Sequence, residues 1–326
     1  MIQLIYNEQL KLWKKKRILV IMLIIACLVP IFTYAQYKES KALQEKIGTT
    51  DWRVKLQKQI VDTQNRLGSA SLSDDFKKYL RITLSQEQYY LNHNINPNAP
   101  GAPTFMRVFI ENAIGMLLPL FVMVAASDIV SAEAGSGTIK LLLTRPVKRW
   151  RILLSKYIAM LLSVSFILLC TAVFTYGISG LVFGYHGWNM PILTGFTIKG
   201  DELLTSHVHA VSQWKYLLMA FGLAWFVGVV SGSLTFMLSV LLRSTAAVMG
   251  IMLSSLIAGA ILTNMVSAWP SAKYLFMVNL QLTNYLNGTS PPVAGMTLGF
   301  SVAVLLVWLF LSLVVSFVVF TKRDVY

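Results

Sequence analysis

Six apolar stretches, each long enough to cross a lipid bilayer as a helix, limit the possible folds of this chain more than any other feature. A transmembrane helix needs roughly 20 mostly apolar residues. The stretches that meet this requirement are 18–37, 105–126, 157–183, 214–242, 246–267 and 296–320. Because a backbone in lipid must satisfy its own hydrogen bonds, each stretch is expected to be helical. The sequence therefore predicts an all-α membrane protein with six transmembrane helices.

The composition agrees with a membrane protein and argues against a nucleic-acid partner. Hydrophobic residues make up 56% of the chain and charged residues 13%, whereas a soluble domain of this size needs more charged side chains. The formal net charge is +14. A basic chain could also bind nucleic acid, but here the basic residues stand beside apolar stretches and not on one polar face.

The basic residues also predict how the chain is oriented in the membrane. They gather on one side, at Lys11, Lys14, Lys15, Lys16, Arg17, Lys140, Arg145, Lys148, Arg149, Arg151, Lys156, Arg243, Lys322 and Arg323. The short loops of the opposite side contain Lys199, Lys215 and Lys273. Loops rich in Lys and Arg stay in the cytoplasm. We therefore expect a multi-pass protein of a bacterial inner (cell) membrane with both termini in the cytoplasm.

Residues 1–17 have the pattern of an amphipathic helix that lies in the membrane surface and contacts lipid. One helical face carries Ile2, Ile5, Tyr6, Leu12 and Trp13, and the other carries Asn7, Glu8, Lys11, Lys14 and Lys15. A cleaved signal peptide is the alternative interpretation. It is disfavoured because the apolar stretch 18–37 continues well past the length of a signal-peptide core.

The segment 38–104 between the first two spans is expected to be an extracellular helical hairpin. Asp51 can cap a first helix that ends at Gly68, and Ser73 can cap a second helix. Both helices have an apolar face, which by itself mostly indicates packing between them. A lid that packs on itself is therefore the simpler interpretation, and a substrate-gating or partner-docking domain is the alternative. The remaining residues, 105–326, are expected to form a five-span region.

The chain lacks the motifs of the common catalytic and nucleotide-binding sites. It contains no G-x-x-x-x-G-K-[ST], G-x-S-x-G or H-E-x-x-H sequence. His207 and His209 could meet Asp201 or Glu202 at a metal, but a solvated loop explains them better. We therefore expect no enzymatic activity, no metal and no cofactor in this chain.

Within the spans, only a few ionisable or small residues are candidates for a functional role. Arg107 and Glu111 stand one helical turn apart, so they are either a substrate or gating contact or an ion pair at the membrane boundary. No series of acidic residues crosses the apolar stretches, which argues against an ion-coupled carrier. Gly228 and Gly232 allow close helix packing, either within the chain or between two copies.

The loop 127–156 between the second and third spans is the most informative segment. Gly135 and Gly137 are expected to end the second helix, and Thr138 to begin a short helix through Leu143. Pro146 can then begin the helix of the third span. A run of Leu141, Leu142 and Leu143 on a basic cytoplasmic surface is unusual for a simple connection and indicates docking of another protein.

This loop resembles the corresponding loop of type-2 permeases of ATP-binding cassette exporters. In that family a Glu is followed by Gly-Thr, a Leu-rich stretch, and Pro-Val with a basic residue. The matching residues here are Glu133, Gly137, Thr138, Leu141, Leu142, Leu143, Pro146, Val147 and Arg149. Six spans and cytoplasmic termini fit the same family, whereas a large external domain occurs in only some of its branches.

The resemblance implies a division of work between subunits. A separate ATP-binding cassette ATPase subunit would bind ATP and Mg²⁺, and a second permease copy or paralogue would complete the translocation path. Residues Ile139 to Leu143 would contact the ATPase as a coupling helix, Glu133 and Arg149 would orient the loop, and the N-terminal helix would follow its motion. An ordinary basic loop that contacts anionic lipid is the simpler interpretation of this segment.

The sequence-based function is thus the permease subunit of an ATP-driven exporter. Such exporters move drugs, antimicrobial peptides or lipid-linked sugars, and the aromatic-rich outer segments favour a hydrophobic or amphipathic substrate. The alternative is a non-transporting membrane sensor or assembly factor that uses the external domain. A third and weaker hypothesis is a secondary carrier, which would follow an ion gradient without ATP.

Overall fold

The computed structural model describes residues 1–49, 51–68, 74–138, 147–199, 202–263, 269–293 and 295–322. Within these residues the chain is mostly helical, and six helical segments are long and apolar enough to cross a membrane. They are Arg17–Ala42, Leu117–Gly135, Arg149–Phe183, Gln213–Leu241, Thr245–Thr263 and Leu298–Lys322. The prediction of a mostly helical protein with six spans is therefore confirmed at the level of length and composition.

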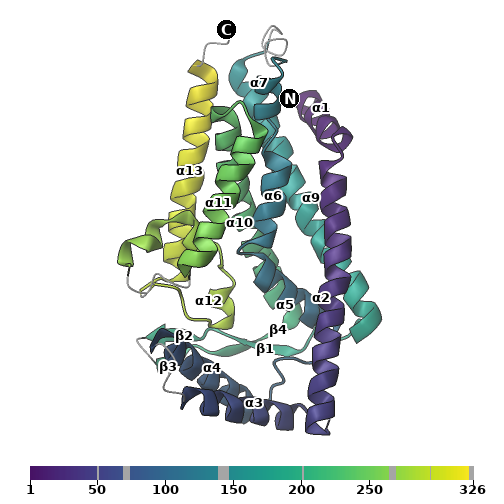
Figure 1. The fold of residues 1–326 in the computed structure, drawn as a ribbon, viewed down its shortest axis with the longest axis vertical. Helices are drawn as coiled ribbons and strands as arrows, with labels where there is room; N and C mark the ends of the chain where they lie inside the picture. Colours follow the sequence, from purple (N-terminus) through teal and green to yellow (C-terminus); the bar gives the residue numbers. More distant parts are fainter. Residues whose placement is uncertain are drawn as a thin grey trace.

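The elements follow one another along the chain as shown in Figure 1. The helices of the first half are α1 (Ile2–Lys14), α2 (Arg17–Ile47), α3 (Trp52–Leu67), α4 (Asp74–Asn92), α5 (Ala102–Ala113), α6 (Leu117–Ala126) and α7 (Ser131–Gly135). The second half has α9 (Arg149–Phe183), α10 (Gln213–Leu241), α11 (Thr245–Thr263), the 3₁₀ helices η2 (Pro270–Tyr274) and η3 (Phe276–Asn279), α12 (Asn284–Asn287) and α13 (Leu298–Lys322). The strands are β1 (Pro191–Thr194), β2 (Thr197–Lys199), β3 (Glu202–Leu204) and β4 (His209–Ser212).

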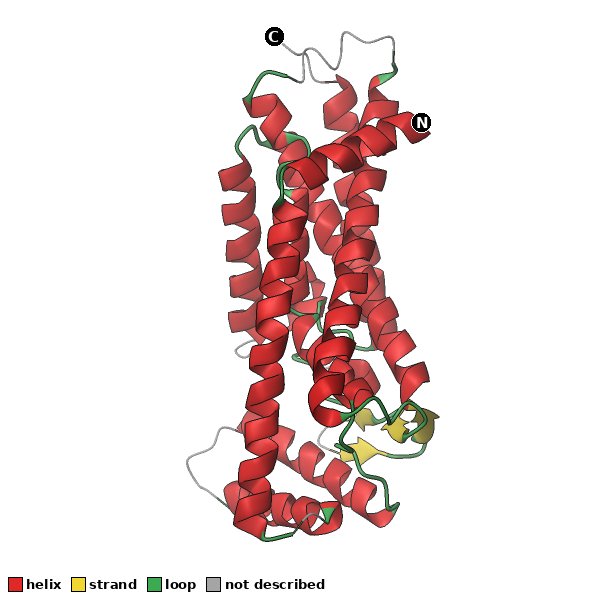
Figure 2. Ribbon diagram, turned by 90° about the vertical axis from the view of Figure 1, so that its right-hand side faces the viewer, coloured by secondary structure: helices red, strands yellow, loops and turns green. Residues whose placement is uncertain are grey.

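The two ends of the bundle differ in character. The start of α1, the end of α13 and α7 lie together at one end, which we call the terminal end (Figure 1). The helices α3 and α4 and the strands lie at the opposite end (Figures 1 and 2). The helix α2 connects the two ends. Its 31 residues, at 1.5 Å per residue, extend about 46 Å, which exceeds the roughly 30 Å of bilayer hydrocarbon.

The helix α1 lies across the bundle and joins α2 through a sharp elbow, Lys15–Arg17 (Figure 2). At the elbow Lys16 has a left-handed backbone with φ of 59°, a conformation that costs a non-glycine residue roughly 1–2 kcal/mol. The two helices are therefore distinct elements and not one continuous helix.

The second expected span, 105–126, is not one helix and needs correction. A turn at 114–116 divides it into α5 and α6, and the segment that qualifies as a span is Leu117–Gly135. Gly115 in this turn faces Gln281, because a Cβ atom on Gly115 would lie 2.6 Å from Gln281 Cγ. A run of apolar residues predicts burial in lipid or protein, but it does not reveal where close packing interrupts the helix.

The all-α class also needs a correction at the end opposite the termini. Two short antiparallel pairs are present among the described residues, β1 with β4 and β2 with β3. In the first pair Pro191 lies opposite Ser212 and Thr194 opposite His209. The sequence shows only a segment rich in Gly and aromatic residues there, because strands of three or four residues are too short for a clear alternating pattern.

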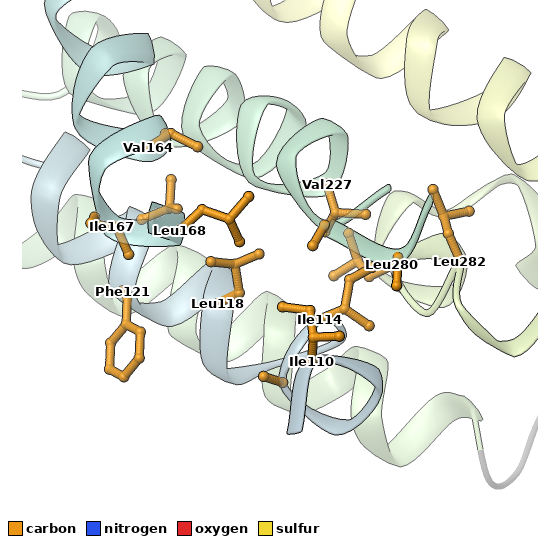
Figure 3. Packing of buried hydrophobic residues seen from close by; sticks show 14 of the residues in the cluster. Ile110, Ile114, Leu118, Phe121, Val164, Ile167, Leu168, Val227, Leu280 and Leu282 are labelled. Carbon is orange, nitrogen blue, oxygen red and sulfur yellow. The ribbon is translucent and has the colours of Figure 1, made fainter. Parts of the chain in front are cut away.

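The hydrophobic core joins segments that are distant in sequence. In Figure 3, Ile114 and Leu118 lie on either side of the break between α5 and α6, near Val227 of α10. Leu280 and Leu282 reach the same core from the segment that follows η3. The segment 276–286 is thus an inner part of the bundle and not a surface loop.

The pair Gly228 and Gly232 on α10 packs within the chain. A Cβ atom on Gly228 would lie 2.9 Å from Val164 Cγ1 of α9, and one on Gly232 would lie 3.0 Å from Met160 Sδ. Of the two interpretations of these glycines, the structure therefore favours close packing of α10 against α9.

The helices α3 and α4 pack on each other, and α4 also contacts the strand β3. The Asp51 carboxylate accepts a hydrogen bond from the Arg53 backbone N–H at the start of α3, whereas the expected cap Ser73 lies outside the described residues. On α4, Gln86 Nε2 donates to the carbonyl oxygens of Asn287 and Gly288, at 3.3 and 2.7 Å. These contacts hold α4 against the loop that follows α12.

Candidate functional site

The candidate site is the terminal end of the bundle, where the loop 127–156 lies. Of the residues predicted to couple to an ATPase, Ile139, Leu141, Leu142, Leu143 and Pro146 lie outside the described residues. Glu133 lies in α7, Gly137 and Thr138 follow it, and Arg149 is the first residue of α9. The short helix α7 directly precedes the segment 139–146, so its contacts decide what that segment is attached to.

The start of α7 is held by α10 and α11. The hydroxyl oxygen of Ser239, on α10, accepts hydrogen bonds from the backbone N–H groups of Val130 and Ser131, at 3.1 and 2.9 Å. These N–H groups have no partner within α7, because the first turn of a helix leaves its donors free. The Ser131 hydroxyl also lies 3.0 Å from that of Thr245 on α11. A serine from another helix thus caps α7.

The end of α7 contacts the turn between α10 and α11. A Cβ atom on Gly135 would lie 2.7 Å from the carbonyl oxygen of Arg243, so only glycine allows this close approach. Gly137 has a φ of +73°, and Thr138 Oγ1 donates to the Glu133 carbonyl oxygen at 3.4 Å. These features turn the chain sharply after α7.

Two carboxylates and two ammonium groups form a ring that we call the charge cluster: Glu8, Lys11, Glu133 and Lys156. Lys156 Nζ lies 2.8 Å from Glu8 Oε2 and 2.8 Å from Glu133 Oε2. The first contact is a hydrogen bond, and the second is an ion pair without hydrogen-bond angles. Lys11 Nζ closes the ring with Glu8 Oε1 at 2.7 Å and Glu133 Oε1 at 2.9 Å. The ring joins α1, α7 and α9.

The cluster is electrostatically balanced and mostly buried. The side chain of Lys156 is 0% exposed, and those of Glu8 and Glu133 are 11% and 15% exposed. Burial by itself lowers the pKa of Lys11, but the hydrogen bonds and charges of Glu8 and Glu133 outweigh it and raise the pKa above its ordinary value. Lys11 is therefore protonated at neutral pH. The pairing of protonated Lys11 with Glu8 and Glu133 stabilises the fold. This stabilisation is fully present below the ordinary lysine pKa and is lost as the pH rises through the raised pKa.

A second group of charges holds the elbow to the end of α6. Asp128 has a side chain that is 1% exposed, and its Oδ2 lies 2.7 Å from Lys15 Nζ and 3.4 Å from Arg17 Nε. The Arg17 guanidinium also donates to the Val124 carbonyl oxygen and to the Ser127 hydroxyl, each at 3.3 Å. A cation at the carboxyl end of a helix interacts favourably with the helix dipole. The elbow is thus tied to the turn that connects α6 and α7.

Glu8 and Lys11 of the polar face of α1 point into the protein, whereas part of its apolar face points outward. Glu8 and Leu12 are buried, whereas Ile2 is 83% exposed and Tyr6 62%. Trp13 is 43% exposed and packs edge-on against Phe166 of α9. The helix α1 therefore combines ion pairs on its inner side with exposed apolar side chains on its outer side.

The two residues predicted to orient the loop lie in different places. Glu133 belongs to the charge cluster, whereas Arg149 donates from Nη1 to the carbonyl oxygen of Thr321, near the end of α13, at 3.3 Å. Both residues stand beside the segment 139–146, on its two sides. Their contacts attach one side of that segment to α1 and the other to α13.

The second pair of candidate residues, Arg107 and Glu111, lies on α5 near the opposite end of the molecule. Arg107 Nη1 lies 3.6 Å from Glu111 Oε1, and Arg107 Nη2 donates to the Pro97 carbonyl oxygen at 2.8 Å. Glu111 also accepts a hydrogen bond from the hydroxyl of Tyr216 on α10. Both side chains are about nine-tenths buried, and their bonds hold α5 to the preceding loop and to α10. Their role in substrate binding or gating stays a prediction.

Comparison with known proteins places the chain in a family. Residues 76–326 match the family described as "Protein of unknown function (DUF2705)". The chain belongs to this family. "Uncharacterized protein YhcI" of Bacillus subtilis (strain 168) is 30% identical over 331 residues, which cover 100% of this chain and 99% of the relative. "Uncharacterized membrane protein YdbK" of the same strain is 29% identical over 215 residues, or 65% of this chain and 80% of the relative.

These comparisons correct the expected family and agree with the expected transmembrane protein. The assignment to the type-2 permeases of ATP-binding cassette exporters is wrong, because the match over residues 76–326 is to the DUF2705 family. The assigning motif is short, and its Gly, Leu, Pro and basic residues also suit any helix break beside a membrane surface. A relative described as a membrane protein and the six apolar helical segments together indicate a multi-pass transmembrane protein.

Several residues of the site did not stand out in the sequence. In the sequence, the pattern of α1 assigns Glu8 and Lys11 only to a polar helix face, and Lys156 contributes only to the predicted orientation of the spans. No sequence pattern distinguishes Ser239 or Asp128. One signal was available, because Lys156 stands directly before an apolar stretch of 27 residues, 157–183. An ionisable residue at such a position is expected to find a partner of opposite charge. The identity of that partner could not be read from the sequence.

Proposed function

We propose that this chain is the membrane permease subunit of an ATP-driven exporter, and that the loop 127–156 docks a separate ATPase subunit. The observation that carries the proposal is the attachment of α7 to helices from across the chain. Glu133 contacts α1 and α9 through Lys11 and Lys156, and the start of α7 is bonded to α10 and α11. A connection between two spans would not need so many buried polar contacts.

The arrangement supports transmission of movement from the loop to the bundle. The segment 139–146 is joined covalently to α7 on one side and leads into α9 on the other. A subunit that moved this segment would pull on α7, and the charge cluster would carry the displacement to α1 and α9. Packed helices linked by ion pairs respond to such a pull as rigid bodies that shift together. ATP and Mg²⁺ would then be held by the partner subunit.

The distribution of charge supports a cytoplasmic location of the terminal end. Lys14, Lys16, Lys148 and Lys322 are exposed there, and basic residues beside spans favour the cytoplasm. Under the proposal both termini are cytoplasmic, the protein belongs to a bacterial inner membrane, and α1 lies in the inner surface of the bilayer. The exposed Ile2, Tyr6 and Trp13 would contact lipid.

The proposal includes a second permease, either another copy of this chain or a paralogue. Only 22% of the most apolar stretch of α11 and 17% of that of α13 is buried, so these two helices leave broad apolar faces exposed. Lipid covers such faces in a monomer, and a second subunit would cover part of them in the complex. The substrate would be hydrophobic or amphipathic, in keeping with the aromatic residues of the outer segments.

Affinity purification of the full-length chain from its native membranes, in mild detergent, tests the docking. The chain is expected to bring down an ATPase subunit, measured by mass spectrometry and by ATP hydrolysis in the eluate. Leu142→Asp should remove at least nine-tenths of that hydrolysis, because a buried carboxylate opposes an apolar contact. Val61→Asp, an exposed apolar residue at the opposite end of the molecule, is the matched control and should have no effect.

Two results would count against the proposal. An unmodified chain that carries no ATPase, or a Leu142→Asp chain that retains all of it, would refute docking at this loop. If deletion of residues 41–91 abolished the cellular function while Leu142→Asp left it intact, the protein would instead act as a sensor or assembly factor through its external domain.

A further inference from the structure

A hollow of about 360 Å³ lies directly beside the charge cluster. One wall is the face of α1 that carries Leu4, Asn7 and Lys14. The other wall is formed by Val147, Ile152 and Ser155, at and just before the start of α9. The hollow therefore lies between the N-terminal helix and the residues that follow the segment 139–146.

The walls of the hollow combine aliphatic surface with one available positive charge. The aliphatic part is supplied by Leu4, Leu10, Val147 and Ile152. Glu8 and Lys11 also line the hollow, but they already pair within the charge cluster. Among the described residues, Lys14 has no ion pair or hydrogen bond to its ammonium group, although it stands at the same wall. A carboxylate flanked by aliphatic groups would match this surface in both charge and polarity.

The hollow extends along α1 from the side of Leu4 and Lys11 to Leu10, which stands one helical turn from Tyr6. At 3.6 residues per turn, positions 4 and 11 lie on the opposite side of the helix from positions 2, 6 and 13. The exposed Ile2, Tyr6 and Trp13 belong to the second set. If these side chains lie in lipid, the Leu4 and Lys11 side of the hollow faces the cytoplasm, where a protein partner has access to it.

We infer that this hollow is a second docking point for the ATPase subunit and that it receives an acidic side chain with aliphatic neighbours. The inference rests on the proposed function, because it needs an ATPase partner at the terminal end. The acidic group would pair with Lys14, and its neighbours would pack on Leu4 and Val147. The occupant would also touch Glu8 and Lys11, of which Lys11 pairs with Glu133. Docking here would therefore act on the same cluster that attaches α7 to the bundle.

Cysteine protection measures the two docking points separately. Asn7→Cys reports on the hollow and Ser136→Cys reports on the loop, each in a chain in which Cys27 and Cys170 are replaced by serine. Both positions are exposed in this structure. The full chain in inverted vesicles is treated with a membrane-impermeant maleimide, with and without the purified ATPase subunit recovered by the affinity purification described above. Both positions should be labelled at least fivefold more slowly when the ATPase is bound.

Charge reversal tests the assigned chemistry. Lys14→Glu is expected to weaken binding of the purified ATPase about tenfold, as a repulsive charge does at an interface, whereas Lys14→Arg should bind within about twofold of the original. Lys16→Glu is the matched control, because Lys16 is an exposed cation two residues further on, in the elbow, that does not line the hollow. It should also stay within about twofold.

The outcomes separate this inference from the proposed function. If no ATPase binds the unmodified chain, the proposed function fails and the inference fails with it. If Ser136→Cys is protected while Asn7→Cys is not, or if Lys14→Glu and Lys16→Glu bind alike, the loop docks the ATPase and the hollow does not. If vesicles rich in phosphatidylglycerol slow the labelling of Asn7→Cys without any ATPase, the occupant is lipid and the inference is overturned.

Discussion

Lys156 illustrates how a buried charge can serve this fold. Its side chain has no exposed surface, and its ammonium group contacts two carboxylates and the Ile129 carbonyl oxygen. Moving a charge out of water is costly, so such a group is tolerated only with well-placed partners. Here the partners come from α1 and α7. The lysine therefore specifies where those two elements lie against α9.

Removal of the Lys156 charge should destabilise the protein strongly. In Lys156→Met, the two buried carboxylates of Glu8 and Glu133 would share Lys11 as their cation. Loss of one partner from a buried ion pair costs about 3–5 kcal/mol. We expect a clearly lower midpoint of thermal unfolding in detergent. The exposed Lys58→Met serves as the control and should not shift it.

A double variant distinguishes the ion pair from simple loss of packing. Glu8→Gln removes one of the carboxylates that Lys156 compensates. The combined Glu8→Gln and Lys156→Met variant should therefore be more stable than the sum of the two single effects implies. Strictly additive effects would show that Glu8 and Lys156 do not interact.

At the scale of elements, α10 is the helix around which the others are placed. Ser239 caps α7 near one end of α10, and Gly228 and Gly232 allow α9 to approach its middle. The C-terminal half of α10 is almost entirely buried, whereas its N-terminal half exposes Trp214, Leu218 and Trp225. A helix with this burial pattern is fixed to its neighbours at one end and borders lipid at the other.

The close approach of α9 and α10 gives a matched pair of glycine substitutions. Gly228→Leu would place a side chain where Val164 already lies, and overpacking of this kind costs about 1–3 kcal/mol. Gly222→Leu adds the same side chain six residues earlier on the same helix, where nothing lies within 4 Å of the new Cβ. Gly228→Leu should unfold at a lower temperature than the original protein, and Gly222→Leu should not. Equal losses would contradict the packing described for Gly228.

The whole molecule is organised around two ends joined by long helices. The charge cluster and the elbow occupy the terminal end, and the opposite end carries α3, α4 and the strands (Figure 1). Because α2 begins at the elbow and reaches Ile47 as one helix that contacts α3, the two ends are mechanically connected. An even number of spans also requires the chain to begin and finish on the same side of a membrane.

The arrangement of the two ends can be tested by labelling in vesicles. Single cysteines at Lys14 and Lys322 should react with a membrane-impermeant maleimide from one side, and a cysteine at Lys58 should react from the other side. A chain without Cys27 and Cys170 is the background. Labelling of inverted and right-side-out vesicles gives the result, and reaction of all three positions from one side would exclude six spans in this order.

Much of the fold could be predicted from residue type alone. Long apolar stretches identify spans because lipid accepts only helices whose backbone is internally bonded, and this holds whatever the neighbours are. The same reasoning does not detect the break at Gly115, where Gln281 packs closely against the backbone. It also misses the strands β1 to β4, in which β1 pairs with β4 on the far side of the β2 and β3 segments.

The candidate site shows the same division more sharply. The sequence by itself determined that the loop 127–156 is rich in basic residues and contains an unusual leucine run. Only the tertiary structure decided that Glu133 meets Lys11 and Lys156. Glu8 and Lys156 are 148 residues apart, and their pairing follows from the way α1 lies on α9. Hydropathy is a property of each segment and can be read locally, whereas an ion pair depends on which segments the fold brings together.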